Sequence, residues 1–421
     1  MNHGKGNQQQ QHHQAAVVHC QKDRVLKSKY YNKVHLQMFC LSMSSALKNG
    51  IKISLLVPSY RRFGRLIRLV CFLNGASKVD RFASFFKNSE ILIADGSPLN
   101  FDFANHQKLE SVIREISNNL DIRFFSCPDS SMLSRQQKLL EESTGQYVAW
   151  LGDEDLPNVD FYPQALKLLN DRKDLAAVGG RYADIKGFRK GKLFFCLQEG
   201  WLDSIEISSI DPLFRLHQYS SLYHLGMPSV YYSLMPRSVV ANYLEIALPI
   251  QSKISLNDCE SILQFSVFMF GSAIVLPKTH VLRDFTMLDH NSDMPGWRLA
   301  DGEEDYCAMA LSIYLARNNF FASNEDALRF INSLQPKSFG SSSPRKQLQG
   351  IIDKSQSDTF QTLVHEIDDG ILKLAADAWK KTAVVCYSPK ALSVIGLNDH
   401  RNIVPFLTRL KHRIQGLIAR H

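Results

Sequence analysis

The stretch SRQQKLLEESTGQYVAWLGDEDLP, residues 134–157, contains a helical pattern, an apolar run and an acidic turn in direct succession. The helix is expected to begin near Ser134 and to end before Gly145, which as a C′ residue tolerates a positive φ. QYVAWL is apolar on both faces, which is typical of a strand buried in a parallel sheet. GDEDLP follows with three carboxylates within three positions. The order predicts a polar site at the carboxyl end of a buried strand.

Strands and helices also alternate on both sides of this stretch. KISLLVPSY (52–60), EILIADGS (90–97) and IRFFS (122–126) are expected to be strands, with helices between them and over 161–169. This alternation predicts an α/β fold with a doubly wound, mostly parallel, Rossmann-like sheet and a helical C-terminal extension. Because ligands of such sheets bind outside the carboxyl ends of the strands, Asp95 and the acidic turn should face one crevice.

The domain organisation follows from changes in composition along the chain. Residues 1–50 are rich in Gln, His and Lys and are expected to form a flexible tail, unless translation begins near Met43. Residues 51–300 form the α/β domain, 301–400 a helical C-terminal region and 401–421 a basic amphipathic helix.

The composition excludes several functional classes. The chain has 421 residues, 45% of them hydrophobic, and a formal net charge of +8. Its basic residues form no dense stripe interleaved with aromatic residues, so nucleic acid is not an expected partner. The eight cysteines have no zinc-ligand spacing and suit a reducing cytosol, so a cytoplasmic location is expected.

Two segments bear on membrane contact. No secretory signal is visible in residues 1–50, and the longest apolar run, 262–276, is shorter than the roughly 20 residues of a spanning helix. That run is expected to be a buried helix followed by a buried strand. In 401–421, apolar residues recur at helical spacing opposite basic residues, without any acid. This helix either lies on the inner face of the cell membrane or docks on the protein itself, and both alternatives stay open.

The acidic turn indicates metal chemistry. Carboxylates that lie close together repel one another unless a cation neutralises them. Asp153 and Asp155 are two positions apart on an extended segment, so their side chains point the same way. Oxygen ligands of this kind suit Mn²⁺ or Mg²⁺, with substrate phosphates completing the coordination. The alternative is a solvated acidic turn without a ligand.

VPSYRR, LIADGS and the 134–157 stretch, in this order and spacing, resemble the serial motifs of family 2-like glycosyltransferases of the GT-A fold. The resemblance spans about residues 51–280. It implies that Asp153 and Asp155 hold a metal ion and the sugar diphosphate. Two positions depart from the family pattern: Gln136 stands in place of an Asn, and Gly152 stands where many relatives have an Asp. The second departure keeps Glu154 as a reserve metal ligand. The residues implied to bind the nucleotide sugar are Pro58, Tyr60, Arg62, Asp95, Arg135 and Asp153.

The resemblance also implies a general base and a lid. Asp258, in SLNDCESILQF, matches the position of the catalytic carboxylate, with Glu260 as the alternate. The other interpretation of Asp258 is a helix N-cap. VLRDFTMLDHNSDMPGW, residues 281–297, resembles the segment that folds over the donor, and in some relatives such a segment adds a histidine to the metal, here His290.

Together these features predict a metal-dependent, inverting glycosyltransferase. The resemblance implies a nucleotide-sugar donor, first of all a UDP-sugar, a glycan or lipid-linked acceptor, and a role in bacterial surface polysaccharide synthesis. The alternative is a catalytically inactive GT-A domain that serves as a nucleotide-sugar binding or assembly module. A nucleotidyltransferase is disfavoured because VPSYRRFGR lacks a Gly-rich phosphate loop.

Overall fold

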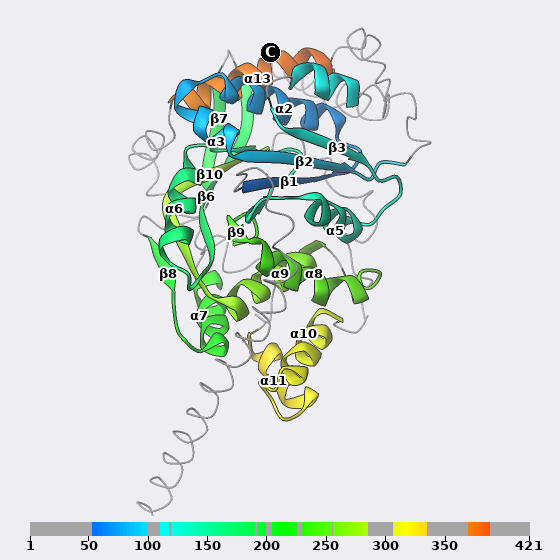
Figure 1. The fold of residues 1–421 in the computed structure, drawn as a ribbon, viewed down its shortest axis with the longest axis vertical. Coiled ribbons are helices and arrows are strands. Elements are labelled where there is room, and N and C mark those ends of the chain that lie inside the picture. Colours follow the sequence, from blue (N-terminus) through cyan, green and yellow to red (C-terminus); the bar gives the residue numbers. More distant parts are fainter. Residues whose placement is uncertain are drawn as a thin grey trace, which may run out of the picture. The chain divides into compact units, whose positions relative to one another are not determined.

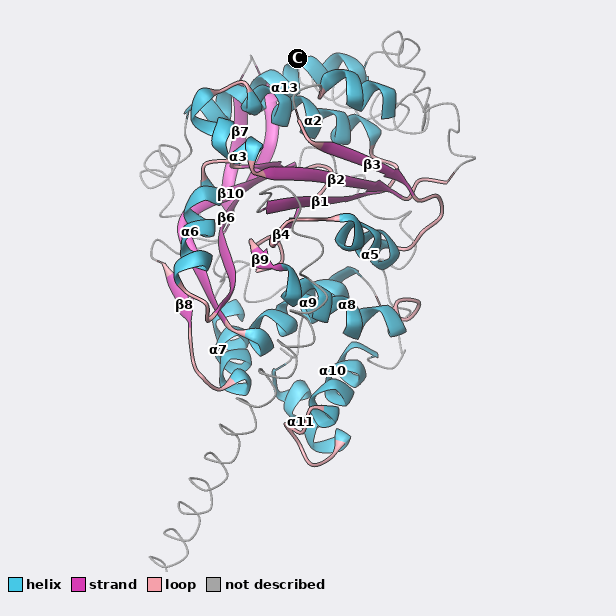
Figure 2. Cartoon of the chain, in the orientation of Figure 1, coloured by secondary structure: helices cyan, strands magenta, loops and turns pink. Residues whose placement is uncertain are grey.

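The computed structural model describes residues 53–98, 110–117, 120–189, 192–198, 204–224, 230–254, 256–284, 306–334 and 369–387. They form an α/β fold in which helices cover both faces of a mostly parallel sheet (Figures 1 and 2). The strands are β1 (Ile53–Ser59), β2 (Ser89–Asp95), β3 (Ile122–Ser126), β4 (Tyr147–Trp150), β5 (Leu156–Pro157), β6 (Leu175–Arg189), β7 (Lys192–Gln198), β8 (Ile205–Ile207), β9 (Met235–Pro236) and β10 (Ser272–Asp284). The helices are α2 (Phe63–Ser77), α3 (Ala83–Lys87), α5 (Met132–Glu142), α6 (Phe161–Asp171), α7 (Pro212–His224), α8 (Arg237–Ala247), α9 (Leu256–Phe270), α10 (Tyr306–Arg317), α11 (Asn324–Leu334) and α13 (Asp369–Tyr387), with short 3₁₀ turns at Asp80–Phe82 and Leu248–Ile250.

The first sheet has the strand order β3-β2-β1-β4-β9. β1, β2, β3 and β4 are parallel, and only the edge strand β9 runs antiparallel. Every residue of β1, β2 and β4 is buried, as expected for parallel strands that are covered on both faces. The predicted fold class is therefore confirmed, and so are the predicted strands at 52–60, 90–97 and 122–126.

A second sheet was not anticipated from the sequence. It has the order β5-β10-β6-β7, with β8 pairing along β10. β10 and β6 are parallel, whereas β5, β7 and β8 pair antiparallel. β6 and β7 are joined by only two residues, and so short a connection permits only an antiparallel pair. Val178 and Leu234, linked by two backbone hydrogen bonds of 2.9 and 3.0 Å, join the strand β6 to the segment before β9.

Two hydrophobic cores lie on opposite faces of the first sheet. Alternate residues of a strand point to opposite faces, so Leu55 and Val57 of β1 pack in one core and Leu56 in the other. The first core includes residues of α2, α6 and α13, and the second includes residues of α5, α8, α9, α10 and α11. Figure 1 shows α2 and α13 on one side of β1 and β2, and α5, α8 and α9 on the other.

The helix α13 is fixed to α2 by a buried arginine. The guanidinium carbon of Arg68 lies 3.6 Å from the centre of the Trp379 ring, and its Nε donates to Thr382 Oγ1 at 3.1 Å.

The described part of 301–400 contains the helices α10, α11 and α13, so the predicted helical content is confirmed there. None of the described helices is both long and apolar enough to cross a bilayer. The predicted tail 1–50 and the predicted helix 401–421 lie outside the described residues.

The ends of α5 differ from the prediction. The helix begins at Met132, two residues before Ser134, and Ser131 caps it, since its side chain accepts a hydrogen bond from the Ser134 backbone N at 3.0 Å. The helix ends at Glu142, and Ser143 is already extended with φ −72° and ψ 147°. Gly145 therefore does not serve as a left-handed C′ residue, and that prediction is wrong. A Cβ at Gly145 would lie 2.7 Å from the Ser54 backbone N, so close packing of the backbones requires this glycine.

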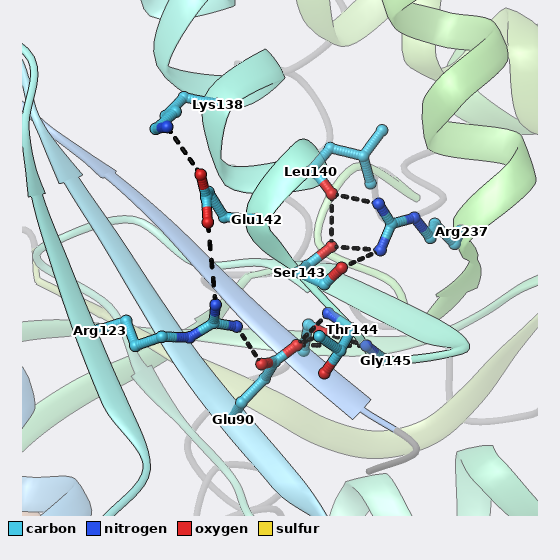
Figure 3. A network of polar contacts seen from close by, with 10 residues as sticks. Glu90, Arg123, Lys138, Leu140, Glu142, Ser143, Thr144, Gly145 and Arg237 are labelled. Atoms are coloured by element: carbon cyan, nitrogen blue, oxygen red, sulfur yellow. Dashed lines mark hydrogen bonds and ion pairs between the residues drawn. The ribbon is translucent and has the colours of Figure 1, made fainter. Parts of the chain in front are cut away.

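A buried carboxylate connects α5 to the sheet (Figure 3). Glu90 of β2 accepts hydrogen bonds from Ser54 Oγ at 2.6 Å and from the Thr144 and Gly145 backbone N atoms at 2.5 and 3.2 Å. Arg123 of β3 forms an ion pair with its other oxygen. Since Glu90 is almost fully buried, this network neutralises a charge that would otherwise be costly.

The substitution Glu90→Gln is expected to lower the free energy of unfolding by about 2–4 kcal/mol, because the new amide group meets donors that need an acceptor. Urea unfolding at pH 7 measures the change. Glu142→Gln is the matched control, because Glu142 pairs with Lys138 and Arg123 at the protein surface and should change the free energy of unfolding far less. Equal effects of the two substitutions would contradict the structural role assigned to Glu90.

Candidate functional site

The candidate site lies where three neighbouring strands of the first sheet end. Ser59, the last residue of β1, pairs in register with Asp95, the last residue of β2. β4 lies on the other side of β1. The next residue, Leu151, donates from its backbone N to Leu56 O at 2.9 Å and leads into the acidic turn. The parallel arrangement thus brings Asp95 and the acidic turn to the same edge of the sheet, as the sequence predicts.

Asp153 is held by two side chains from the region of β1. Its Oδ2 accepts from Ser59 Oγ at 2.9 Å, and its Oδ1 accepts from Arg62 Nη1 at 3.1 Å. Only 4% of the Asp153 side chain is exposed, so the carboxylate depends on these partners for charge compensation. Ser59 was not singled out from the sequence, although a hydroxyl at the last position of a buried strand is a usable signal.

Glu154 points toward the start of α2. Arg62 Nη1 lies 3.1 Å from Glu154 Oε2, and Arg65 forms a second ion pair with the same oxygen. Arg62 precedes the first residue of α2, and this helix has no acid in its first turn. The N-terminus of a helix disfavours positive side chains unless an anion is near. The acidic turn supplies that anion here, and Glu154 acts as a partner of arginines.

Asp155 is fully buried and accepts from the Gly152 backbone N at 3.2 Å. The pKa of Asp155 is raised to about 7, mainly by burial and to a smaller extent by the charge of Asp153, whereas Arg283, the Gly152 backbone N–H and Arg62 oppose the shift. A Cβ at Gly152 would lie 2.6 Å from Asp155 Oδ2. The glycine at this position therefore has a steric reason, because the carboxylate of Asp155 folds back over it.

The substitution Gly152→Ala is expected to push the Asp155 carboxylate aside, because a side-chain terminus yields more easily than the backbone. For the activity proposed below, we expect about a tenfold loss of kcat/KM because the Asp155 carboxylate is displaced, with little change in Tm. Initial rates and thermal melting measure the two quantities. Gly145→Ala is the matched control, since its Cβ meets backbone and should lower Tm instead. A fall in Tm for Gly152→Ala that accounts for the lost activity would contradict the steric interpretation.

Asp95 and Arg135 form the other half of the site. Asp95 Oδ1 accepts from Ser97 Oγ at 2.8 Å, and Arg135 of α5 is bound to the Ser130 backbone O. A Cβ at Gly96 would overlap the Arg135 guanidinium. Burial lowers the pKa of Arg135, and the charges of Asp95 and Asp153 oppose that shift, so the guanidinium is close enough to both carboxylates to be stabilised by them.

Tyr60 lies close to two guanidinium groups. Its ring centre is 5.1 Å from the Arg61 guanidinium carbon and 5.5 Å from that of Arg135. Arg61 adopts a left-handed conformation with φ 55°, and its backbone N donates to Ser97 Oγ at 2.8 Å. This hydrogen bond fixes the loop after β1 against the loop after β2. Pro58 is buried within β1, one pair before Ser59 and Asp95.

Gln136, which stands in place of the family's asparagine, is fully buried. Its Nε2 donates to Tyr231 OH at 2.7 Å, and its Oε1 accepts from Tyr243 OH at 2.6 Å. Both hydrogen-bonding ends of the amide are therefore satisfied by tyrosines. The residue joins α5 to α8 and to the tyrosine pair 231–232, a link that no spacing in the sequence indicated.

The segment at the start of α9 contributes two carboxylates. Asp258 lies in the first turn of the helix and is partly buried, so it is a helix residue and not an N-cap. Burial raises the pKa of Glu260 to about 7, and Arg283 opposes the shift. Burial raises the pKa of Tyr232, and the charges of Asp155 and Glu260 raise it further. Glu260 and Asp155 are therefore both close enough to Tyr232 for their charges to affect its pKa.

The structure brings five predicted residues into one cluster: Arg62, Asp95, Arg135, Asp153 and Asp155. Pro58 and Tyr60 flank this cluster, and Asp258 lies on the neighbouring helix α9. His290 lies outside the described residues. Among the described residues, no group of three or more His, Cys, Asp or Glu side chains is arranged to hold a metal ion.

Comparisons with known proteins give a limited result. No family model and no curated protein matches the chain. Among solved structures, Staphylococcus aureus TarS matches with 11% identity and a TM-score of 0.42, over 80% of this chain and 55% of that chain. TarS 1–349 in complex with UDP-GlcNAc matches with 10% identity and a TM-score of 0.46, over 80% of this chain and 91% of that chain. The chain thus spans about half the length of the longer TarS chain. At this level of similarity, function has to be argued from the residues of the site.

Proposed function

We propose that this protein is a metal-dependent glycosyltransferase that moves a sugar from a nucleotide-sugar donor to a hydroxyl group of a glycan or glycoconjugate. The observation that supports this most strongly is the cluster of buried carboxylates and arginines at the ends of β1, β2 and β4. A UDP-sugar is the donor to test first, and a lipid-linked or surface-polysaccharide acceptor is the corresponding acceptor class.

The donor set at Asp153 and Asp155 fits Mn²⁺ or Mg²⁺. The two carboxylates are buried, their charges repel, and hard divalent cations prefer oxygen ligands. Since the described residues offer no third acidic, histidine or cysteine ligand, phosphate oxygens and water would complete the coordination. When bound, the cation neutralises negative charge that builds up on the leaving diphosphate.

The residues of the chain would divide the remaining work. Arg62 and Arg135, whose guanidinium groups already contact or approach the carboxylates, would bind the diphosphate oxygens. Asp95 would accept hydrogen bonds from the nucleoside. A carboxylate of α9 would take the proton of the acceptor hydroxyl as its oxygen forms a bond to the anomeric carbon. The bond between that carbon and the diphosphate oxygen then breaks, and the nucleoside diphosphate leaves with the electron pair, which inverts the configuration.

The two carboxylates of α9 are supported by different observations. Asp258 is implied by the sequence resemblance. Glu260 is supported by its neighbourhood, since its charge affects the pKa of Tyr232, as do the charges of Asp155 and Arg283. A pKa of about 7 also suits a general base near neutral pH. We therefore assign the base to Glu260 and keep Asp258 as the residue to test against it.

A screen of nucleotide sugars for donor hydrolysis, with and without Mn²⁺, tests the proposed function. The expected result is hydrolysis of one donor or a few related ones, dependent on Mn²⁺ and abolished by EDTA. Thermal stabilisation by a nucleotide and Mn²⁺ without hydrolysis or transfer would instead support a catalytically inactive binding module. Failure of every nucleotide sugar both to bind and to react would overturn the proposal.

A further inference from the structure

A single guanidinium nitrogen of Arg62 contacts two carboxylates of the acidic turn. Arg62 Nη1 lies 3.1 Å from Asp153 Oδ1 and 3.1 Å from Glu154 Oε2. The second oxygen of Asp153 accepts from Ser59 Oγ at 2.9 Å. Both oxygens of Asp153 are therefore already used by the protein, and the positive partner is an arginine.

A divalent cation at Asp153 Oδ1 would compete with Arg62. The guanidinium and the cation carry the same sign of charge and need the same lone-pair region of a buried carboxylate. Ser59 contributes only a neutral hydroxyl, which can remain bound beside a cation. Cation binding therefore requires that Arg62 leaves Asp153.

Glu154 is a second anionic partner of Arg62, so Arg62 can leave Asp153 and still lie close to a negative charge. Arg62 already shares its nitrogen with Glu154, and about a quarter (26%) of the Glu154 side chain is exposed. Arg65 is bound to the same carboxylate oxygen. After it leaves Asp153, Arg62 thus stays close to an anion at the N-terminus of α2, where backbone N–H groups also favour negative charge. A diphosphate suits this position, because it offers oxygens to the arginine and to the helix terminus.

From this geometry, and resting on the proposed function, we propose that Arg62 is an exchangeable counter-ion of the donor site. It neutralises Asp153 when no donor is bound, competes with a divalent cation that arrives alone, and transfers to the diphosphate when cation and donor bind together. The site consequently has a low affinity for the cation alone, and cation and diphosphate bind cooperatively. Glu154 is the positioning residue that keeps the guanidinium within reach.

The test is a pair of titrations on the full-length protein and the variant Arg62→Gln. Calorimetry with MnCl₂ alone should show about tenfold tighter binding to Arg62→Gln, the size expected for the loss of one competing charged hydrogen bond. Titration with UDP in saturating MnCl₂ should show about tenfold weaker binding to the same variant. A loss of fold or a merely structural role would weaken both affinities, so the opposite signs identify the exchange.

Arg65→Gln is the matched control, because it removes an equal charge that pairs with Glu154 and not with Asp153. Its MnCl₂ affinity should change by less than about threefold, through screened long-range electrostatics. Arg62→Lys is a second variant that keeps the charge and should fall between the wild type and Arg62→Gln. Circular dichroism checks that each variant is folded.

The outcomes separate this inference from the proposed function. If the wild type binds MnCl₂ and Arg62→Gln binds it no more tightly than Arg65→Gln does, the counter-ion exchange is wrong while the glycosyltransferase proposal stands. If Arg62→Gln binds UDP and Mn²⁺ as well as the wild type does, the transfer to the diphosphate is wrong. If no variant binds Mn²⁺ with or without UDP, the inference falls together with the proposed metal dependence.

Discussion

Replacement of Asp153 by asparagine is expected to lower kcat/KM for the donor by about a thousandfold, which corresponds to about 4 kcal/mol of lost transition-state stabilisation. Asparagine keeps the shape of the side chain and one oxygen that can accept from Ser59. It removes the charge that is proposed to bind the cation and that balances Arg62. Asp155→Asn should have an effect of similar size, because its carboxylate is the second proposed ligand of the cation. Initial rates over a range of Mn²⁺ concentrations measure both the rate and the apparent cation affinity.

Asp160→Asn is the matched control for this prediction. Asp160 lies shortly after the acidic turn and forms an ion pair with Arg81 at 3.7 Å, whereas Asp153 pairs with Arg62. Its rates and its Mn²⁺ dependence should equal those of the wild type. Unchanged kcat/KM and unchanged cation affinity in the double variant Asp153→Asn, Asp155→Asn would overturn the proposed metal site and the function built on it.

Glu260→Gln is expected to lower kcat by about a thousandfold with donor KM nearly unchanged, because the amide cannot accept the proton of the acceptor hydroxyl. Asp258→Asn, a neighbouring carboxylate in the same helical turn, is the matched comparison. We expect it to lower kcat less than Glu260→Gln does. The reverse order would return the role of general base to Asp258, as the resemblance of the sequence implies.

The raised pKa of Glu260 determines how the rate should depend on pH. A base must be deprotonated to act, so kcat/KM in saturating Mn²⁺ should rise with pH up to about 7 and then level off.

The same pKa shift affects stability, because a carboxyl whose pKa is raised by folding binds more protons in the folded state than in the unfolded state. Glu260 therefore favours folding at low pH and loses that contribution as the pH rises from the ordinary value of 4.5 to about 7. Relative to the wild type, Glu260→Gln should thus gain stability between pH 5 and pH 8, which urea unfolding at both pH values measures.

The local patterns that were strong in the sequence correspond to the described structure. The apolar runs that end in PSY, ADGS and WLGDED became buried parallel strands, because only strands covered on both faces are apolar throughout. The expected buried helix and strand within 262–276 are α9 and β10. The misplaced ends of α5 have a different origin. Gly145 suits a helix C′ position locally, whereas its actual constraint comes from Ser54, which is far away in the chain.

By itself, the sequence determined the fold class and the edge of the sheet at which Asp95, Asp153 and Asp155 meet, because strand direction and burial are encoded in short apolar runs that end in polar turns. Only the tertiary structure decided how the charges of the acidic turn are compensated: Arg62 pairs with Asp153, and Arg65 pairs with Glu154. It also decided that the strands after residue 175 form a second sheet. The physical reason is that ion pairs and strand partners join segments far apart in the chain. Their energies depend on distance and burial, which no local pattern of residues records.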